Sequence, residues 1–323
     1  MIIKDAFSIT TSKFSLVYQV ILVLLIAMLF FGIIGYAILA PTLSGYVNDL
    51  KGLGVGKVIK DYVKSIFISG DGIQQAGENT HYQALVDTVK DIGVITKNHV
   101  GSIWGGIIAI IIIALLFSVF YHICLYTVTD TLHAFMSSDS EYGFLSNMIA
   151  NIKKSMKFSL AYVGMFIISM IVVVGLSLGL GFLVGALNNY LGILVAYITA
   201  LLLISMQRAL FAGWMPAYIV SDLTVKESLA VNFKKAGERF KDQLGVYFVL
   251  NLSTFILGIL VGICTLGFGI FIVWSFSAVL SQAHDMVDYY HYKGKKYYRD
   301  QQHVVDPTKK YKEAVLDIGF EEK

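Results

Sequence analysis

The sequence predicts an all-α, polytopic membrane protein: a bundle of six transmembrane helices with short interfacial amphipathic helices and both termini on the cytoplasmic side. Three observations predict this fold. Of 323 residues, 56% are hydrophobic and 15% are charged, against about 25% charged in a soluble domain. The apolar residues lie in long runs without Asp, Glu, Lys or Arg, and the basic residues gather in alternate connections. This composition excludes a disulfide-rich scaffold, a disordered chain and a nucleic-acid-binding domain.

The first two uncharged runs are each the length of one span. Leu16 to Ala40 and Val100 to Thr129 carry no Asp, Glu, Lys or Arg, and a hydrocarbon layer of about 30 Å needs about 20 helical residues. We place spans at 16–40 and 102–128. Runs this apolar satisfy their backbone hydrogen bonds in lipid only as helices. The first run is too long for a signal peptide and is followed by no A-x-A site, so we expect a retained anchor.

The next two runs are each long enough for two spans. Phe158 to Gln207 holds 50 uncharged residues and Gln243 to His284 holds 42. The first predicts spans at 158–187 and 190–212, separated at Asn188-Asn189-Tyr190, where adjacent amides suit a turn. The second predicts spans at 243–264 and 268–288, separated near Thr265–Gly269.

The basic residues predict the orientation. With both termini inside, the cytoplasmic segments hold 18 Lys and Arg residues and the outer side holds six, as the positive-inside rule requires. We therefore expect a plasma-membrane domain over 1–290, with an extracytoplasmic loop at 41–99 and a cytoplasmic tail at 291–323. The loop pattern predicts one amphipathic helix before Gly70-Asp71-Gly72 and a second around Leu85–Ile92.

The connections repeat. The second and fourth spans both end in Y-x-V-[ST]-D, at Tyr126–Asp130 and Tyr218–Asp222. Each motif is followed by an amphipathic basic segment, at 144–154 and 227–237, and then by a charge-free hairpin. The unit is a short interfacial helix followed by two spans. We interpret Asp130 and Asp222 as caps of the following interfacial helix, with functional carboxylates as the alternative.

Four segments carry a resemblance to a known pattern: Trp214–Asp222, Lys226–Leu229, Lys235–Gly237 and Leu266–Gly269. They resemble the bacterial YciC-like multi-pass families and the membrane domain attached to some glycerophosphodiester phosphodiesterases, mainly over residues 205–290. The sequence departs from the pattern at Pro216, which Ala217 rather than Tyr follows, and in its long outer loop. The resemblance implies paired membrane helices and no particular activity, and no phosphodiesterase catalytic motif is present.

Arg208 is the only Lys or Arg inside a predicted span, the one at 190–212. A charge within a span is by default a functional hypothesis, here a contact to substrate or lipid phosphate. Counted from Tyr190, it lies about 28 Å along an ideal helix, at the inner interface. There it can also snorkel to phosphate or contact another helix, and both interpretations stay open.

The last span ends in titratable residues. His284, Asp288 and His291 stand at i, i+4 and i+7, a spacing that places them on one helical face with Asp285 nearby. Two imidazoles and a carboxylate can bind a divalent metal, which makes these residues metal candidates. The alternative is a polar helix edge leaving the lipid.

The expected partners are lipids. Aromatic and basic residues alternate in the segment 289–299, which directly follows a span. We interpret this segment as an aromatic belt with cytoplasmic charge that attracts the anionic inner leaflet, and not as a nucleic-acid site. Glycine pairs in the third and fifth spans predict close helix packing, with a homo-oligomer face as the alternative. The outer loop can also bind a protein partner.

No catalytic motif occurs in a supporting context. We therefore expect a non-enzymatic membrane protein without a cofactor. It would transport or export a small or amphipathic substrate, or assist such a system. One alternative is a structural or assembly factor that binds partners through the outer loop and tail. Another is a membrane enzyme acting on lipid headgroups through Asp130, Asp222, His284 and Asp285.

Labelling tests the orientation. In a chain lacking both native cysteines, Asn79→Cys should react with an impermeant thiol reagent added to intact cells. Lys312→Cys should not react, because the basic tail stays inside. Equal labelling at the two positions would rule out this topology.

Overall fold

The computed structural model describes residues 2–68, 80–138, 143–300, 303–308 and 313–315. Gly70–Gly72, Asn79 and Lys312 lie outside this part of the chain. The chain forms two compact units, one of residues 1–25 with 118–323 and the other of residues 26–117.

Six helical segments are long and apolar enough to cross a membrane, which confirms the predicted fold class and identifies a multi-pass membrane protein. Large apolar side chains such as Leu29, Ile111 and Ile171 are exposed along them. A surface of this kind is a liability in water and needs lipid as its solvent. The helices that carry the segments are α2 (Phe14–Gly52), α5 (Val100–Ser138), α7 (Ile152–Gly185), α8 (Asn189–Phe211) with α9 (Trp214–Val220), α10 (Val225–Cys264) and α11 (Gly269–Lys293).

The smaller unit contains most of α2, α3 (Val55–Ile68), α4 (Thr80–Asn98) and the first half of α5. The two helices predicted within the outer loop are present as α3 and α4. Helix α2 does not end at Pro41 but continues through the proline to Gly52. Side-chain hydrogen bonds stabilise this stretch: the Thr42 hydroxyl donates to the Ile38 carbonyl at 2.7 Å, and His99 Nε2 lies 2.8 Å from Asp49 Oδ2.

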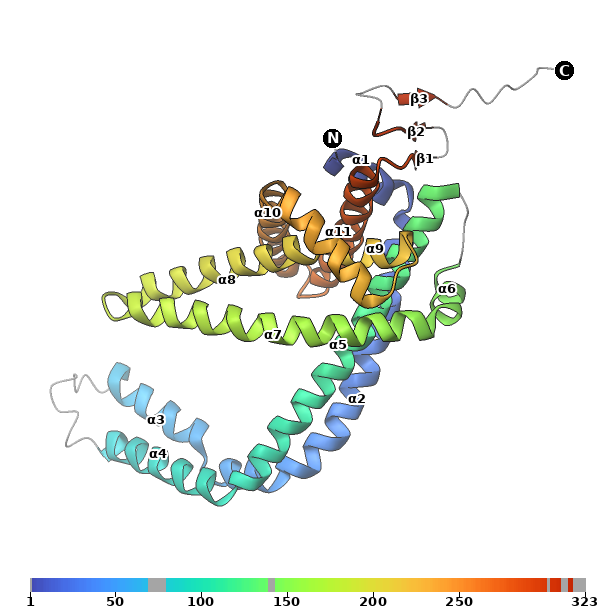
Figure 1. Cartoon of the computed structure of the whole chain (residues 1–323). Helices are drawn as coiled ribbons and strands as arrows, with labels where there is room; N and C mark the ends of the chain where they lie inside the picture. The colour runs from blue at the N-terminus through green and yellow to red at the C-terminus, as the bar shows by residue number, and fades with distance from the viewer. Residues whose placement is uncertain (1, 69–79, 139–142, 301–302, 309–312, 316–323) are drawn as a thin grey trace. The chain divides into compact units, whose positions relative to one another are not determined.

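Helices α7 and α8 form a hairpin (Figure 1) and approach each other closely beside its turn. The chain turns at 186–188, where the Asn188 side chain accepts hydrogen bonds from the Tyr190 and Leu191 amides. Beyond the turn the helices almost touch. A Cβ atom added to Gly192 would lie 2.5 Å from the Cα of Gly185 and 2.6 Å from the Gly181 carbonyl oxygen. Only glycine at this position permits the approach.

Helices α8, α10 and α11 run antiparallel in succession. Tyr197 near the start of α8 packs against Phe255 near the end of α10. Helices α10 and α11 form a second hairpin, which turns at 265–268, where Gly267 has a φ of 95°. Beyond that turn, the Thr254 and Ser277 hydroxyl oxygens of α10 and α11 lie 2.7 Å apart.

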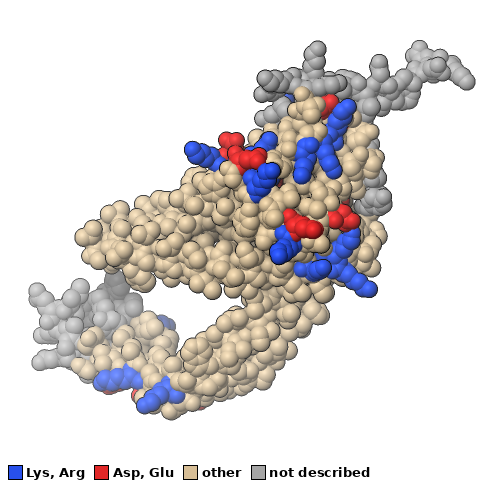
Figure 2. Space-filling model, viewed as in Figure 1, with Lys and Arg blue, Asp and Glu red and all other residues tan. Residues whose placement is uncertain are grey.

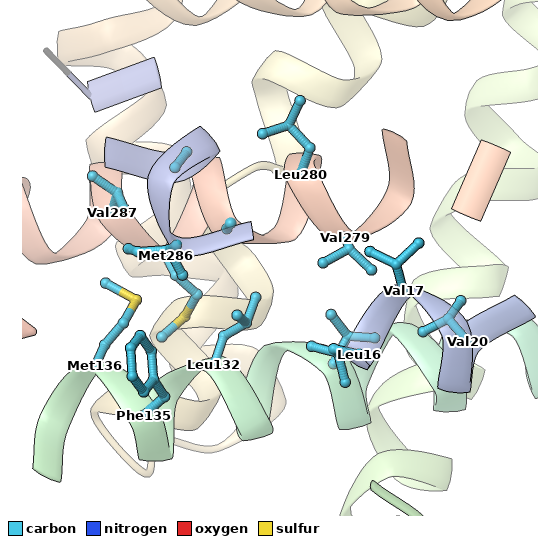
Figure 3. Packing of buried hydrophobic residues seen from close by; sticks show 14 of the residues in the cluster. Leu16, Val17, Val20, Leu132, Phe135, Met136, Val279, Leu280, Met286 and Val287 are labelled. Carbon is cyan, nitrogen blue, oxygen red and sulfur yellow. The ribbon is translucent and has the colours of Figure 1, made fainter. Parts of the chain in front are cut away.

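The core of the larger unit surrounds α11. In its most apolar window 61% of α11 is buried, against 6–22% in the other five segments. Figure 3 shows how helices far apart in the sequence meet around it. The core includes Ala6 and Ile9 of α1 (Ile2–Ser12), Leu16, Val17 and Val20 of α2, Leu132, Phe135 and Met136 of α5, and Val279, Met286 and Val287 of α11.

The interfacial segments differ from one another. The segment 144–154 forms the short helix α6 (Phe144–Ala150) and the first turn of α7. The segment 227–237 is instead continuous with α10, which begins in a capping box of Thr224 and Glu227. The interpretation of Asp130 and Asp222 as caps is therefore wrong. Asp130 lies inside α5, and Thr224 rather than Asp222 caps the next helix.

The tail folds back onto the helices. It forms a three-stranded antiparallel sheet of β1 (Tyr297–Asp300), β2 (His303–Val305) and β3 (Glu313–Val315). The Tyr297 hydroxyl donates to Asp5 Oδ2 of α1 at 2.8 Å. Burial and the Asp5 carboxylate raise the pKa of Tyr297 far above its ordinary value, so this phenol remains a hydrogen-bond donor.

The aromatic-belt interpretation of segment 289–299 is wrong for three of its five tyrosines. Tyr289, Tyr290 and Tyr297 are buried, because the larger unit offers each hydroxyl a partner. Tyr289 pairs with the Ser221 hydroxyl and Tyr290 with His133 Nδ1. The lysines of the segment are exposed. On the face in Figure 2, charged residues of the larger unit gather away from the turn end of the α7–α8 hairpin, which shows none.

The packing of the α7–α8 hairpin generates a stability prediction. Gly192→Ala should lower the free energy of unfolding by about 1–3 kcal/mol, because the added methyl overpacks the helix contact. Gly175→Ala is the matched control, since its Cβ meets no atom within 4 Å and alanine favours the helix. Unfolding in mixed micelles measures both. Equal effects would contradict the packing argument.

Candidate functional site

One face of α10 carries a row of polar side chains. They recur every three or four residues, the spacing that places side chains on one face of a helix. All are buried except Arg239, which is half-buried. The row is Ser228, Asn232, Lys235, Arg239, Gln243 and Tyr247.

Asp288 of α11 forms the centre of the polar contacts. Lys235 Nζ pairs with its Oδ2 atom, and Arg239 Nη1 lies 2.6 Å from its Oδ1 atom. Lys235 is 2% exposed and Asp288 is 1% exposed. A buried ion is tolerated only when it is paired, and here one carboxylate holds two cations.

Asp285 lies one helical turn from Asp288 and has a different environment. The Tyr247 hydroxyl donates a short hydrogen bond to its Oδ1 atom. His284 Nδ1 lies 3.6 Å from the same oxygen and has no hydrogen-bond partner in the described structure. Together with Lys235, Arg239 and Asp288, these three residues form what we call the ionic cluster.

Arg208 of α8 lies beside the ionic cluster. Its Nη1 atom is 3.3 Å from the Ser281 hydroxyl of α11. It is close enough to Tyr121, Tyr162 and Asp285 for its charge to act on them. Within the described residues it forms no ion pair. Arg208 is thus a half-buried guanidinium with one long hydrogen bond.

The site residues lie at a common depth. Arg208 is about 28 Å along α8 from the 186–188 turn, Asp285 about 24 Å along α11 from the 265–268 turn, and Tyr247 about 26 Å along α10 from that same turn. A hydrocarbon layer is about 30 Å thick. Arg208, Asp285 and Tyr247 therefore all lie near one boundary of the hydrocarbon layer, the boundary farther from the two turns.

Asn232 closes a break in the fourth apolar segment. Helix α8 ends at Phe211 and α9 begins at Trp214. The Asn232 side chain donates to the Leu210 carbonyl at 2.7 Å and accepts from the Gly213 amide at 2.9 Å. Backbone groups freed by a break need a hydrogen-bond partner when protein buries them, and α10 supplies it.

The two Y-x-V-[ST]-D motifs make equivalent contacts. Asp130 accepts from Asn151 Nδ2 at 3.0 Å, and Asp222 pairs with Lys154 at 3.0 Å, both at the start of α7. The preceding hydroxyl residues both contact α11, Thr129 through Gln282 and Ser221 through Tyr289.

The candidate carboxylates fall into two groups. Asp130 and Asp222 contact the start of α7 at the surface, whereas His284 and Asp285 are buried in the ionic cluster. The structure therefore does not gather the four residues into one site.

The metal candidates do not converge. Asp288 is occupied by two cations, and His291 Nε2 lies 3.0 Å from the Tyr297 hydroxyl. No group of three metal-binding side chains occurs among the residues that the structure covers.

Sequence reasoning missed Lys235, Arg239 and Tyr247. The signal was available, because these residues continue the polar spacing of 228–247 across the assumed boundary between an interfacial helix and a span. Comparisons with protein-family models, curated proteins and solved structures found no match for this chain.

The ionic cluster generates a prediction about stability. Lys235→Met should lower the free energy of unfolding by about 3 kcal/mol, since removing one partner of a buried pair costs about 3–5 kcal/mol and Arg239 remains. Lys234→Met, at the exposed neighbouring position, is the control and should be near neutral. Unfolding in mixed micelles again provides the measurement. A silent Lys235→Met would contradict the central role of this pair.

Proposed function

We propose that the chain is a non-enzymatic plasma-membrane protein, with both termini in the cytoplasm, that transports or exports an amphipathic, anionic substrate. In this orientation the two hairpin turns face outward and the ionic cluster lies at the inner boundary of the hydrocarbon layer. The observation that carries the proposal is Arg208, a guanidinium at headgroup depth without an ion pair in the described structure.

The chemistry of Arg208 supports an anionic substrate. A charge at this depth is unfavourable unless something pairs with it. The guanidinium presents a planar fork that matches phosphate or carboxylate. Exposed apolar side chains of α7 and α8, such as Ile168 and Leu202, offer a surface on which the apolar part of a substrate can lie.

The separation of the candidate carboxylates favours this proposal over a lipid-headgroup enzyme. Such an enzyme would need Asp130, Asp222, His284 and Asp285 around one substrate, and they lie in two groups. An assembly factor remains an outcome of the test below.

A vesicle assay tests the proposal. The protein is reconstituted into phosphatidylcholine vesicles that contain fluorescent phosphatidylglycerol, and dithionite bleaches the label that reaches the outer leaflet. Wild type should bleach beyond the outer-leaflet fraction. Arg208→Ala should slow this by about tenfold, because a hydrogen bond to a charged group contributes about 1.5–3 kcal/mol. Arg208→Lys should be intermediate, since it keeps the charge and loses the fork.

Lys241→Ala, which removes an exposed charge of α10, serves as the control and should match wild type. Bleaching no greater than in empty vesicles, or equal rates in all variants, would contradict the proposal. Release of a water-soluble headgroup would instead indicate an enzyme. A protein that co-purifies in fixed ratio, without lipid movement, would indicate an assembly factor.

A further inference from the structure

Two buried aspartates one turn apart on α11 differ in their partners. Asp288 contacts the side chains of Lys235 and Arg239. Asp285 contacts the Tyr247 hydroxyl and lies near His284, and within the described residues no lysine or arginine pairs with it. The same residue type thus occupies a cation-rich and a cation-poor position in the same cluster.

The groups around Asp285 come from four helices. Its charged and titratable neighbours are Lys235 and Tyr247 from α10, His284 and Asp288 from α11, Arg208 from α8 and Tyr162 from α7. The two nearby cations, Lys235 and Arg208, have other partners. Lys235 pairs with Asp288, and Arg208 bonds to the Ser281 hydroxyl.

This environment suits a carboxylic acid better than a carboxylate. An ionised carboxylate that is buried without a cation in contact is strongly unfavourable, and binding a proton removes that charge. Asp285 is only 8% exposed. His284 Nδ1, 3.6 Å away and without a hydrogen-bond partner in the described structure, is placed to take the proton.

We propose that Asp285 is a proton-binding site of the membrane domain and that its exchange with His284 couples the proposed transport to a proton gradient. In the exchange, the O–H bond of the acid breaks and an N–H bond forms at Nδ1 of neutral His284. A carboxylate–imidazolium pair results. The coupling rests on the proposed function, whereas the proton site does not.

Polar side chains lie on both sides of this site along the helices. Arg239, whose side chain is 30% exposed, marks the solvent end. In the other direction hydroxyl groups continue through Ser281 to Thr254 and Ser277, about 15 Å from the 265–268 turn. Beyond them Gly262 packs against the Ile270 side chain. Protons therefore reach Asp285 from the cytoplasmic end of the proposed topology.

Infrared difference spectroscopy of the full-length protein near neutral pH tests the proton site. Wild type should show the carbonyl stretch of a protonated carboxylic acid, and Asp285→Asn should abolish it. Tyr247→Phe should shift the band without removing it, because it deletes the hydrogen bond alone. Asp222→Asn is the matched control and should leave the band in place, since the exposed Asp222 carboxylate pairs with Lys154 outside the ionic cluster.

The outcomes separate the two claims. Absence of the band from wild type, or its persistence in Asp285→Asn, would overturn the proton site. In vesicles, an imposed proton gradient should change the wild-type rate of lipid-label movement, and Asp285→Asn should move label at one rate with or without the gradient. Gradient-independent wild-type movement would overturn the coupling. A band assigned to Asp285 without any lipid movement would leave the proton site standing and the transport proposal contradicted.

Discussion

The ion pairs of Asp288 organise the larger unit. A buried carboxylate that binds Lys235 and Arg239 fixes the rotation and register of α11 against α10. Lys235 also packs against Gly213, where an added Cβ would lie 2.8 Å from its Cδ atom, so the same side chain positions the end of the fourth span. Replacing such a network by apolar residues can leave stability unchanged, whereas breaking it is unfavourable. Its main effect is to select one arrangement of helices that would otherwise slide within lipid.

The sequence allowed the spans to be predicted because lipid imposes a simple rule: no charge over about 20 residues. The same rule obscured the site. Lys235 and Arg239 lie just outside an uncharged run. The sequence pattern places Lys235 in an interfacial segment at 227–237 and Arg239 in no element, although α10 continues through both without a break. Their partner Asp288 lies 49 residues from Arg239. No local pattern specifies a contact of that range. Arg208 stands out because a basic residue in a span is rare, and Asp285 because it adjoins the spaced titratable residues at the end of the last span.

The tail shows the opposite case, in which a local pattern was clear and misleading. Alternating tyrosine and lysine after a span is typical of a membrane interface. Three of the five tyrosines nevertheless lie inside, because Ser221, His133 and Asp5 satisfy their hydroxyls. The repeat, in contrast, holds in three dimensions. The rings of Tyr126 and Tyr218 both pack against Phe158, so the two motifs hold α11 and the start of α7 in matching ways.

The hydrogen bonds of Asn232 bear on how the chain is made. The Leu210 carbonyl and the Gly213 amide belong to the fourth span, whereas the side chain that satisfies them belongs to the fifth. Synthesis proceeds from the N-terminus, so the two backbone groups enter the bilayer before their partner has been translated. The third and fourth spans therefore do not mature as a self-sufficient hairpin. These two backbone groups gain their partner only after residue 232 has been synthesised. The α7–α8 and α10–α11 hairpins therefore form one unit of biogenesis.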